Sequence, residues 1–329
     1  MLGLFERNLD KKRILIVCPY DRKTLHICEA IGKLSLELKT KNSKIEKQIV
    51  IVGKKDKITN NLKELNLDNR LEKHIEEKII DKANDEDLVY YINQIMDEDT
   101  IIVIGEVNNY VRIKIGLDDE VYSHHVIDFP ELRHFVFVSS SINGRYKAEE
   151  KKNQILSINR FMNSLGINKI RIAFIVDEVS KGDFLEINLM RMILKDALGK
   201  NVSLMNPCNL NKIFDDNYYD NIYDKKINLL VFKNNDITAS FLDTLNIFSN
   251  SRICTVDICN NVKNRIFIDS RKQKDEQSIM FALLISKKIN FMNAYRETNH
   301  YIKNANNIVN ANNKLNKRYK KYVDTTLGV

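Results

Sequence analysis

A serine and an arginine stand side by side where an apolar segment of the chain ends. Residues 266–268 are apolar, Ser270 and Arg271 follow after one aspartate, and a second apolar segment begins after a short polar turn. An arginine fork can bind two oxygens of a phosphate at once, and a helix N-terminus beside it favours negative charge. Polar residues are also common in turns that bind nothing. The pair therefore indicates either an anion site or solvated surface.

The composition indicates a globular protein long enough for two domains. The chain has 329 residues, of which 43% are hydrophobic and 29% charged, and two domains of ordinary size fit this length. No apolar stretch approaches the roughly 20 residues that cross a bilayer, and the N-terminus does not have the pattern of a signal peptide. We therefore expect a cytoplasmic protein without a membrane partner.

The cysteines do not form a recognisable metal or disulfide pattern. There are five, and they are scattered without a CxxC pair: Cys18, Cys28, Cys208, Cys254 and Cys259. In a cytoplasmic chain, such cysteines are typically reduced and structural. The sequence thus predicts no metal site.

The net charge of +8 raises the question of nucleic-acid binding. Basic and acidic residues are interspersed, however, and no recognition motif accompanies them. The most biased stretch is the tail at residues 290–329, which is rich in Asn and Lys and has only Glu297 and Asp324 as acidic residues. We expect a basic helix that packs on the body or on a second subunit, and we expect no nucleic-acid partner.

Apolar runs rich in β-branched residues recur along the chain and are separated by segments of helical character. Runs that are continuous rather than alternating are typical of parallel strands buried on both faces. Their alternation with helices predicts an α/β protein with right-handed crossovers. Neither GxGxxG nor a P-loop is present, so no dinucleotide or triphosphate cradle is expected. The predicted strands are residues 13–18, 48–53, 100–105, 134–138, 170–176, 227–232 and 252–258.

Five stretches combine such strands with single glycines and polar turns in a particular order. They read IVIVGKKDKI, DTIIVIGEVNN, IGLDDEVYSHHVIDFPELRHFVFVSSSIN, ILSINRFMNSLGINKIRIAFI and IFIDSRKQKDEQSIMFALLIS. Their order and spacing, from about residue 13 to residue 289, resemble the phosphate acetyl/butyryltransferase family. The resemblance is closest to phosphate butyryltransferase, of which this chain looks like a divergent member.

The resemblance implies a fold and a reaction. The fold would be α/β, with two lobes of mostly parallel sheet, an inter-domain cleft and a helical basic C-terminal tail. The first domain would comprise residues 1–140 and 270–329, and the second residues 141–269. The reaction would transfer a short acyl group between coenzyme A and phosphate, with the coenzyme A thioester as substrate, no bound cofactor and a homo-oligomeric enzyme.

The resemblance also assigns roles to individual residues. Arg271 would bind phosphate, and Ser270 would donate to the phosphate or to the developing oxyanion. Ser123 and His124 match a Ser-His pair and would be catalytic with Ser270. Two alternatives remain open, because Ser123 can also cap a strand and His124 can be a hydrogen-bonded interior histidine.

Two further positions match residues that close strands in the family. Gly105 ends the strand before the substrate loop, and Asn143 closes a later strand; both would bind phosphate or coenzyme A. Asn143 stands before Gly144, which is also an ordinary turn dipeptide.

The departures from the family fall mostly on the chemistry. Ile104 stands where the butyryl branch has a lysine, and Asp118 stands where a phosphate-binding arginine is expected, with residues 119–120 also acidic. Arg112 or Arg145 are candidate substitutes that the sequence does not place. Two hypotheses follow: an acyltransferase, or a catalytically impaired paralogue that binds a coenzyme A-like ligand or a partner protein in a regulatory or scaffolding role.

Replacing Asp118 with arginine is expected to tighten phosphate binding, because the carboxylate repels a phosphate dianion whereas a guanidinium attracts it. Calorimetric titration of phosphate into the wild type and into Asp118→Arg measures the difference. Tight binding by the wild type that the substitution leaves unchanged would contradict this electrostatic argument.

Overall fold

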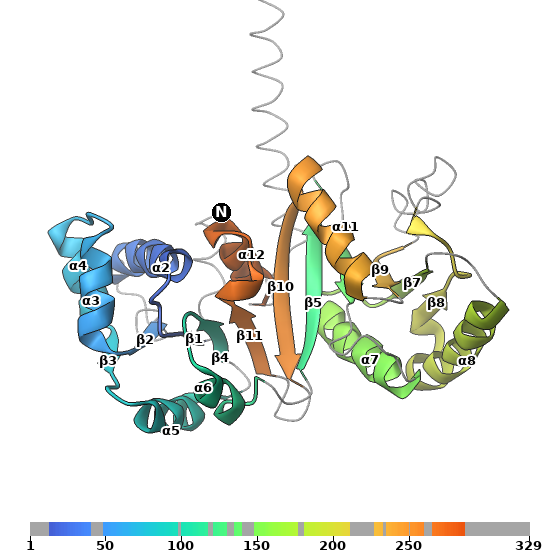
Figure 1. Cartoon of the computed structure of the whole chain (residues 1–329), viewed down its shortest axis with the longest axis horizontal. Helices are drawn as coiled ribbons and strands as arrows, with labels where there is room; N and C mark the ends of the chain where they lie inside the picture. Colours follow the sequence, from blue (N-terminus) through green and yellow to red (C-terminus); the bar gives the residue numbers. More distant parts are fainter. Residues whose placement is uncertain are drawn as a thin grey trace, which may run out of the picture.

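The computed structural model describes residues 13–40, 49–97, 100–117, 121–129, 135–139, 148–176, 181–210, 227–232, 235–249, 251–259 and 265–286. Its strands form one mixed sheet of eleven strands in the order β3-β2-β1-β4-β11-β10-β5-β6-β9-β7-β8. The central strands β11, β10 and β5 lie in the middle of the molecule (Figure 1). The α/β class expected from the sequence is confirmed.

The sheet has a parallel part at each side and an antiparallel centre. In the order of the sheet, all neighbouring strands from β3 to β11 are parallel, and so are those from β6 to β8. In the centre, β10 runs antiparallel to both β11 and β5, and β5 runs antiparallel to β6. The strands are β1 (Arg13–Val17), β2 (Ile49–Gly53), β3 (Ile79–Asp81), β4 (Thr100–Ile104), β5 (Val121–Asp128), β6 (Phe135–Ser139), β7 (Ile170–Ile175), β8 (Val202–Leu204), β9 (Leu229–Phe232), β10 (Arg252–Cys259) and β11 (Arg265–Asp269).

The lengths of the connections explain the change of direction at the centre. Only residues 129–134 separate β5 from β6, and only residues 260–264 separate β10 from β11. Parallel neighbours need a crossover of a dozen or more residues, whereas antiparallel neighbours can be joined directly. The two parallel parts that the sequence predicts are therefore joined by β10 and β5 into one continuous sheet.

The helices cover the two faces of the sheet unequally. On the first face, α2, α3, α4, α7, α8 and α12 contribute to one large apolar core. On the second face, α5 and α6 build one apolar cluster and α11 builds another. The described helices are α2 (Arg22–Thr40), α3 (Lys55–Lys63), α4 (Asn69–Glu76), α5 (Asp85–Ile95), α6 (Asn109–Lys114), α7 (Ala148–Ser164), α8 (Lys181–Leu198), α11 (Asn235–Phe248) and α12 (Glu276–Ser286).

Between its two apolar clusters, the second face of the sheet carries polar side chains. Val121 of β5 and Cys259 of β10 belong to the cluster under α5 and α6, while Ile127 and Ile253 of the same strands belong to the cluster under α11. Alternate side chains of a strand share a face, so the residues between these ends lie on the same face. We call them the polar band: Ser123, His125, Thr255 and Asp257.

The predicted strands leave out the three-residue strands β3 and β8 and also the eight-residue β5. The Ser-His pair lies inside β5. Helix α12 packs against α2, β10 and β11. The residue ranges of the two domains stay a prediction, and the tail at residues 290–329 lies outside the described residues.

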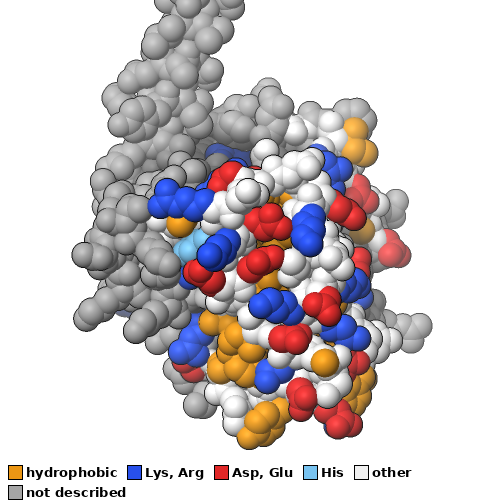
Figure 2. Space-filling view, turned by 90° about the vertical axis from the view of Figure 1, so that its left-hand side faces the viewer, with side chains coloured by type: hydrophobic (Ala, Val, Ile, Leu, Met, Phe, Trp, Pro, Cys, Tyr) orange, Lys and Arg blue, Asp and Glu red, His pale blue; other side chains and the backbone are white. Residues whose placement is uncertain are grey.

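The described surface mixes charges of both signs. On the side that carries α3 and α4, basic and acidic side chains alternate (Figure 2). No helix in the described part of the chain is both long enough and apolar enough to span a membrane.

Candidate functional site

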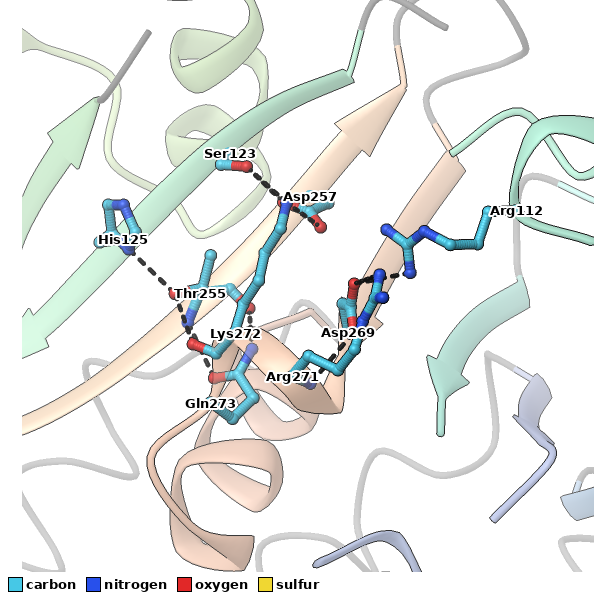
Figure 3. A network of polar contacts seen from close by, with 9 residues as sticks. All are labelled: Arg112, Ser123, His125, Thr255, Asp257, Asp269, Arg271, Lys272 and Gln273. Carbon is cyan, nitrogen blue, oxygen red and sulfur yellow. Dashed lines mark hydrogen bonds and ion pairs between the residues drawn. The ribbon is translucent and has the colours of Figure 1, made fainter. Parts of the chain in front are cut away.

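The carboxylate that ends β11 holds two arginines. Asp269 Oδ2 accepts hydrogen bonds from Arg112 Nη1 at 2.9 Å and from Arg271 Nη2 at 3.2 Å, and its Oδ1 accepts from Arg271 Nε at 3.3 Å. Arg112 reaches it from α6, and Arg271 from the 3₁₀ turn η4 (Ser270–Lys272) (Figure 3). The Asp269 side chain is 1% exposed, whereas that of Arg271 is 53% exposed. Arg271 thus has one end on a buried anion and a face toward solvent.

This arrangement keeps Asp269 ionised. Burial by itself raises the pKa of a carboxyl group, but the hydrogen bonds from Arg271 and the charge of Arg112 outweigh it and hold the pKa of Asp269 below its usual range. Two guanidinium groups facing one carboxylate leave a surplus of one positive charge. The end of β11 is therefore suited to an additional anion.

The hydroxyl of Ser270 is bound inside the protein. Ser270 is buried, and its Oγ donates to Asp21 Oδ2 at 3.0 Å. Lys23 Nζ donates to the carbonyl oxygens of Ser270 at 2.9 Å and of Gln273 at 2.7 Å. Lys23 lies at the start of α2, and Asp21 stands directly before this helix. The segment that follows β1 therefore holds the turn in place. For Ser270 to donate to a ligand, its hydroxyl must leave Asp21.

Ser123 lies in a second polar cluster beside the turn. Its Oγ donates to Asp257 Oδ1 at 2.6 Å and accepts from Lys272 Nζ at 2.9 Å. Lys272 Nζ also lies 2.8 Å from both carboxylate oxygens of Asp257. A hydroxyl, a carboxylate and an ammonium thus meet from β5, β10 and η4 (Figure 3).

Gln273 joins the turn to the polar band. Beyond the pair of Asp257 and Phe267, β11 no longer pairs with β10, and the Gln273 carboxamide takes its place. Its Nε2 donates to Thr255 O at 2.7 Å, and its Oε1 accepts from Thr255 N at 3.0 Å. This contact satisfies both backbone groups of a buried strand residue.

His125 of the polar band is neutral at pH 7. Its Nδ1 lies 2.9 Å from Thr255 Oγ1. Burial, and then the positive charge of Lys272, lower the pKa of His125 to about 4. The band therefore carries only the Asp257 charge, which Lys272 balances.

His124 lies on the opposite face of β5 from Ser123, because successive side chains of a strand alternate. It is fully buried, and its ring nitrogens contact Ser157 Oγ at 3.2 Å and Ser139 Oγ at 3.3 Å. Burial lowers its pKa to about 3, with a smaller effect of His125. The structure therefore does not bring His124 together with the other predicted site residues.

Gly105 permits a close approach of two loops. It follows Ile104, which pairs with Asp269 in the sheet, and its N–H donates to Val17 O at 2.9 Å. A Cβ at this position would lie 2.2 Å from the carbonyl oxygen of Cys18, so only glycine fits. Gly105 thus lies at the same edge of the sheet as the arginine cluster, that is, Asp269 with Arg112 and Arg271.

The remaining predicted site residues belong to parts of the chain that the structure does not describe. Asn143, Arg145 and the acidic residues 118–120 lie outside the described residues. Among the described residues, no group of three or more His, Cys, Asp and Glu side chains is arranged to hold a metal ion.

Sequence reasoning missed most partners of the predicted residues. It left Arg112 unplaced and did not single out Asp269, Lys272, Gln273 or Asp257. A signal for the polar band was present, since Ser123 and His125 in VYSHHVID and Thr255 and Asp257 in RICTVDIC stand two positions apart within strands. This alternation indicates a face that no apolar helix covers.

Comparison with known proteins shows a fold. No protein-family model and no curated protein sequence matches the chain. A branched-chain phosphotransacylase from Enterococcus faecalis V583 is 12% identical with a TM-score of 0.56, over 83% of this chain and 99% of that one. A phosphotransacetylase from Streptococcus pyogenes is 12% identical with a TM-score of 0.60, over 88% of this chain and 97% of that one. A 4-hydroxythreonine-4-phosphate dehydrogenase from Burkholderia phymatum is 13% identical with a TM-score of 0.48, over 88% and 98%.

The two phosphotransacylases cover most of this chain at low identity. The phosphate acyltransferase-like fold that the sequence predicts is therefore confirmed. The closer resemblance to phosphate butyryltransferase stays a prediction.

Arg112→Met and Arg271→Met are expected to have unequal effects on stability. Arg112 is buried with Asp269, so its loss should lower the free energy of unfolding by about 3 kcal/mol. Arg271 is half exposed, so its loss should cost about 1 kcal/mol or less. Urea unfolding at pH 7 measures both values.

The pH dependence provides the control for this comparison. The pKa of Asp269 is depressed in the folded protein, so its ion pairs stabilise the fold above the unfolded pKa of about 4 and this contribution is lost as the pH falls through the folded pKa. The difference between the wild type and Arg112→Met should therefore shrink in acid. Equal costs for the two substitutions at pH 7 would contradict the assignment of Arg112 as the structural partner.

Proposed function

We propose that this chain is a phosphate acyltransferase-like protein that transfers a short acyl group between coenzyme A and phosphate. The observation that carries the proposal is the position of Arg271, a half-exposed cation at the carboxyl end of a parallel strand in a phosphotransacylase-type fold. Ligands of open α/β sheets bind at the carboxyl ends of the strands. The acyl group is a short one, and the enzyme is a cytoplasmic homo-oligomer.

The chemistry assigns a role to each cation. Arg271 binds the phosphate or the phosphoryl group of an acyl phosphate, which suits its fork of donors. Lys272 follows it directly and places an ammonium group, which pairs with Asp257, beside the hydroxyl of Ser123. A tetrahedral intermediate of acyl transfer develops negative charge on oxygen, and fixed cations stabilise that charge.

The carboxylates at the site limit its affinity. Asp269 already accepts hydrogen bonds from Arg271, and Asp257 from Lys272. A phosphate must compete with both anions for the same donors, so we expect weak phosphate binding and slow turnover compared with a site of unpaired arginines.

A second candidate function is a non-catalytic member that binds a coenzyme A-like ligand or a partner protein. It is favoured by Ser270 and His124, which the resemblance assigns to catalysis. The Ser270 hydroxyl donates to Asp21, and His124 is fully buried between two serines. In this case the turn would bind the ligand without reacting with it.

The activity is expected to appear as release of coenzyme A from butyryl-CoA that requires phosphate, and Arg271→Met should reduce it at least tenfold through the loss of one charge-assisted hydrogen bond. A thiol reagent measures the release. All five cysteines of the chain are buried, which keeps the background low. Lys63→Met, at an exposed position of α3, is the matched control and should leave the rate unchanged.

The outcomes separate the two candidates. Phosphate-dependent release that Arg271→Met abolishes supports the enzyme. Binding of butyryl-CoA without any release supports the non-catalytic member. Neither release nor binding, with a phosphotransacetylase active in the same assay, would contradict both.

A further inference from the structure

A pocket of about 360 Å³ lies beside the polar band. Its floor is the sheet, with His125, Ile253 and Thr255. Residues of α11 also line it, together with Lys272 and Lys274 from the segment that follows β11. Figure 3 shows the floor residues His125 and Thr255 beside Lys272 of the turn. The volume lies within the range of about 300–1,000 Å³ typical of small-molecule sites.

Two opposite charges line this pocket without pairing with each other. Lys274 Nζ donates to the backbone oxygen of Asn246 at 2.8 Å, and an ammonium has three donors, so two remain for a ligand. Asp243 of α11 makes no hydrogen bond or ion pair within the described part of the chain. An ammonium and a carboxylate therefore face one volume and remain separate.

The other groups of the pocket add no net charge. Lys272 is balanced by Asp257, which lies 2.8 Å from its ammonium at both oxygens. His125 is neutral at pH 7 because burial and Lys272 lower its pKa to about 4. The pocket thus has no net charge but contains one separate positive and one separate negative group. This favours a ligand that also carries one positive and one negative charge.

The rest of the lining is suited to a small apolar substituent. Ala239 and Leu242 of α11 and Ile253 of β10 line the pocket together with the charged groups. The lining includes one carboxylate and one ammonium, Asp243 and Lys274. A ligand with only one charge would pair with one of these groups and offer no partner to the other.

We propose that this pocket binds a small zwitterion with an apolar side chain, that is, an α-amino acid of the size of L-valine. The ligand carboxylate binds Lys274, the ligand ammonium binds Asp243, and the side chain contacts Leu242 and Ile253. The site uses neither Arg271 nor Ser270, so it stands or falls independently of the acyl transfer.

Calorimetric titration of the full-length chain with three matched probes tests the proposal. L-valine carries both charges, isovalerate lacks the ammonium, and isobutylamine lacks the carboxylate. L-valine should bind at one site per chain, and each of the other two should bind at least tenfold more weakly, because one charge-assisted hydrogen bond is lost.

Variants locate the binding. Lys274→Met and Asp243→Asn change exposed side chains, so both should fold, and each should weaken L-valine about tenfold. Ala239→Phe should fill the pocket and abolish binding, whereas Ser240→Phe, at the next exposed position of α11 and outside the lining, should leave it unchanged. Melting curves of all variants establish that they are folded.

Three outcomes would overturn the proposal. These are the absence of L-valine binding at millimolar concentration, isovalerate binding as tightly as L-valine, and full L-valine binding by a folded Ala239→Phe. The second outcome would identify a site for simple anions instead.

Discussion

The centre of this protein depends on the need to neutralise one buried carboxylate. Asp269 ends β11 in the middle of an eleven-stranded sheet and is 1% exposed. An uncompensated charge at such a depth costs several kcal/mol, so Arg112 and Arg271 are both drawn to it. This pairing links α6, β11 and the following turn, and it also determines which cation remains available to a ligand.

The antiparallel centre of the sheet determines where polar chemistry can occur. The strands β10 and β5 lie between two parallel parts, and their second face lies between the clusters under α5–α6 and under α11. The polar band occupies this interval, where the polar side chains of Gln273 and Lys272 contact it in place of apolar helix side chains. The arginine cluster and the pocket lie on either side of Lys272, so both candidate sites follow from the same gap in the helical cover.

Most of the strands could be predicted from the sequence because they are largely apolar runs, whose burial on both faces is a local property. The strands β3 and β8 are too short to give this signal, and β5 is interrupted by the polar residues 123–125. The turn at Ser270 and Arg271 was also predicted, because it follows such a run directly. The partners Asp21 and Arg112 could not be predicted, since they are 249 and 157 residues distant from Ser270 and Asp269 in the chain. His124 is separated from Ser123 for a different reason. The two residues are adjacent in β5, so their side chains point to opposite faces of the sheet.

The central claim is that Arg271 is an anion ligand that Asp269 partly occupies, and phosphate titration of Asp269→Asn tests it most directly. Removing the negative charge frees the donors of Arg271 and Arg112, so the account predicts phosphate binding about tenfold tighter than in the wild type. A melting curve at pH 7 establishes that the variant is folded. Phosphate affinity equal to or weaker than that of the wild type in a folded Asp269→Asn would contradict the account, and Arg271 would then serve only to neutralise Asp269.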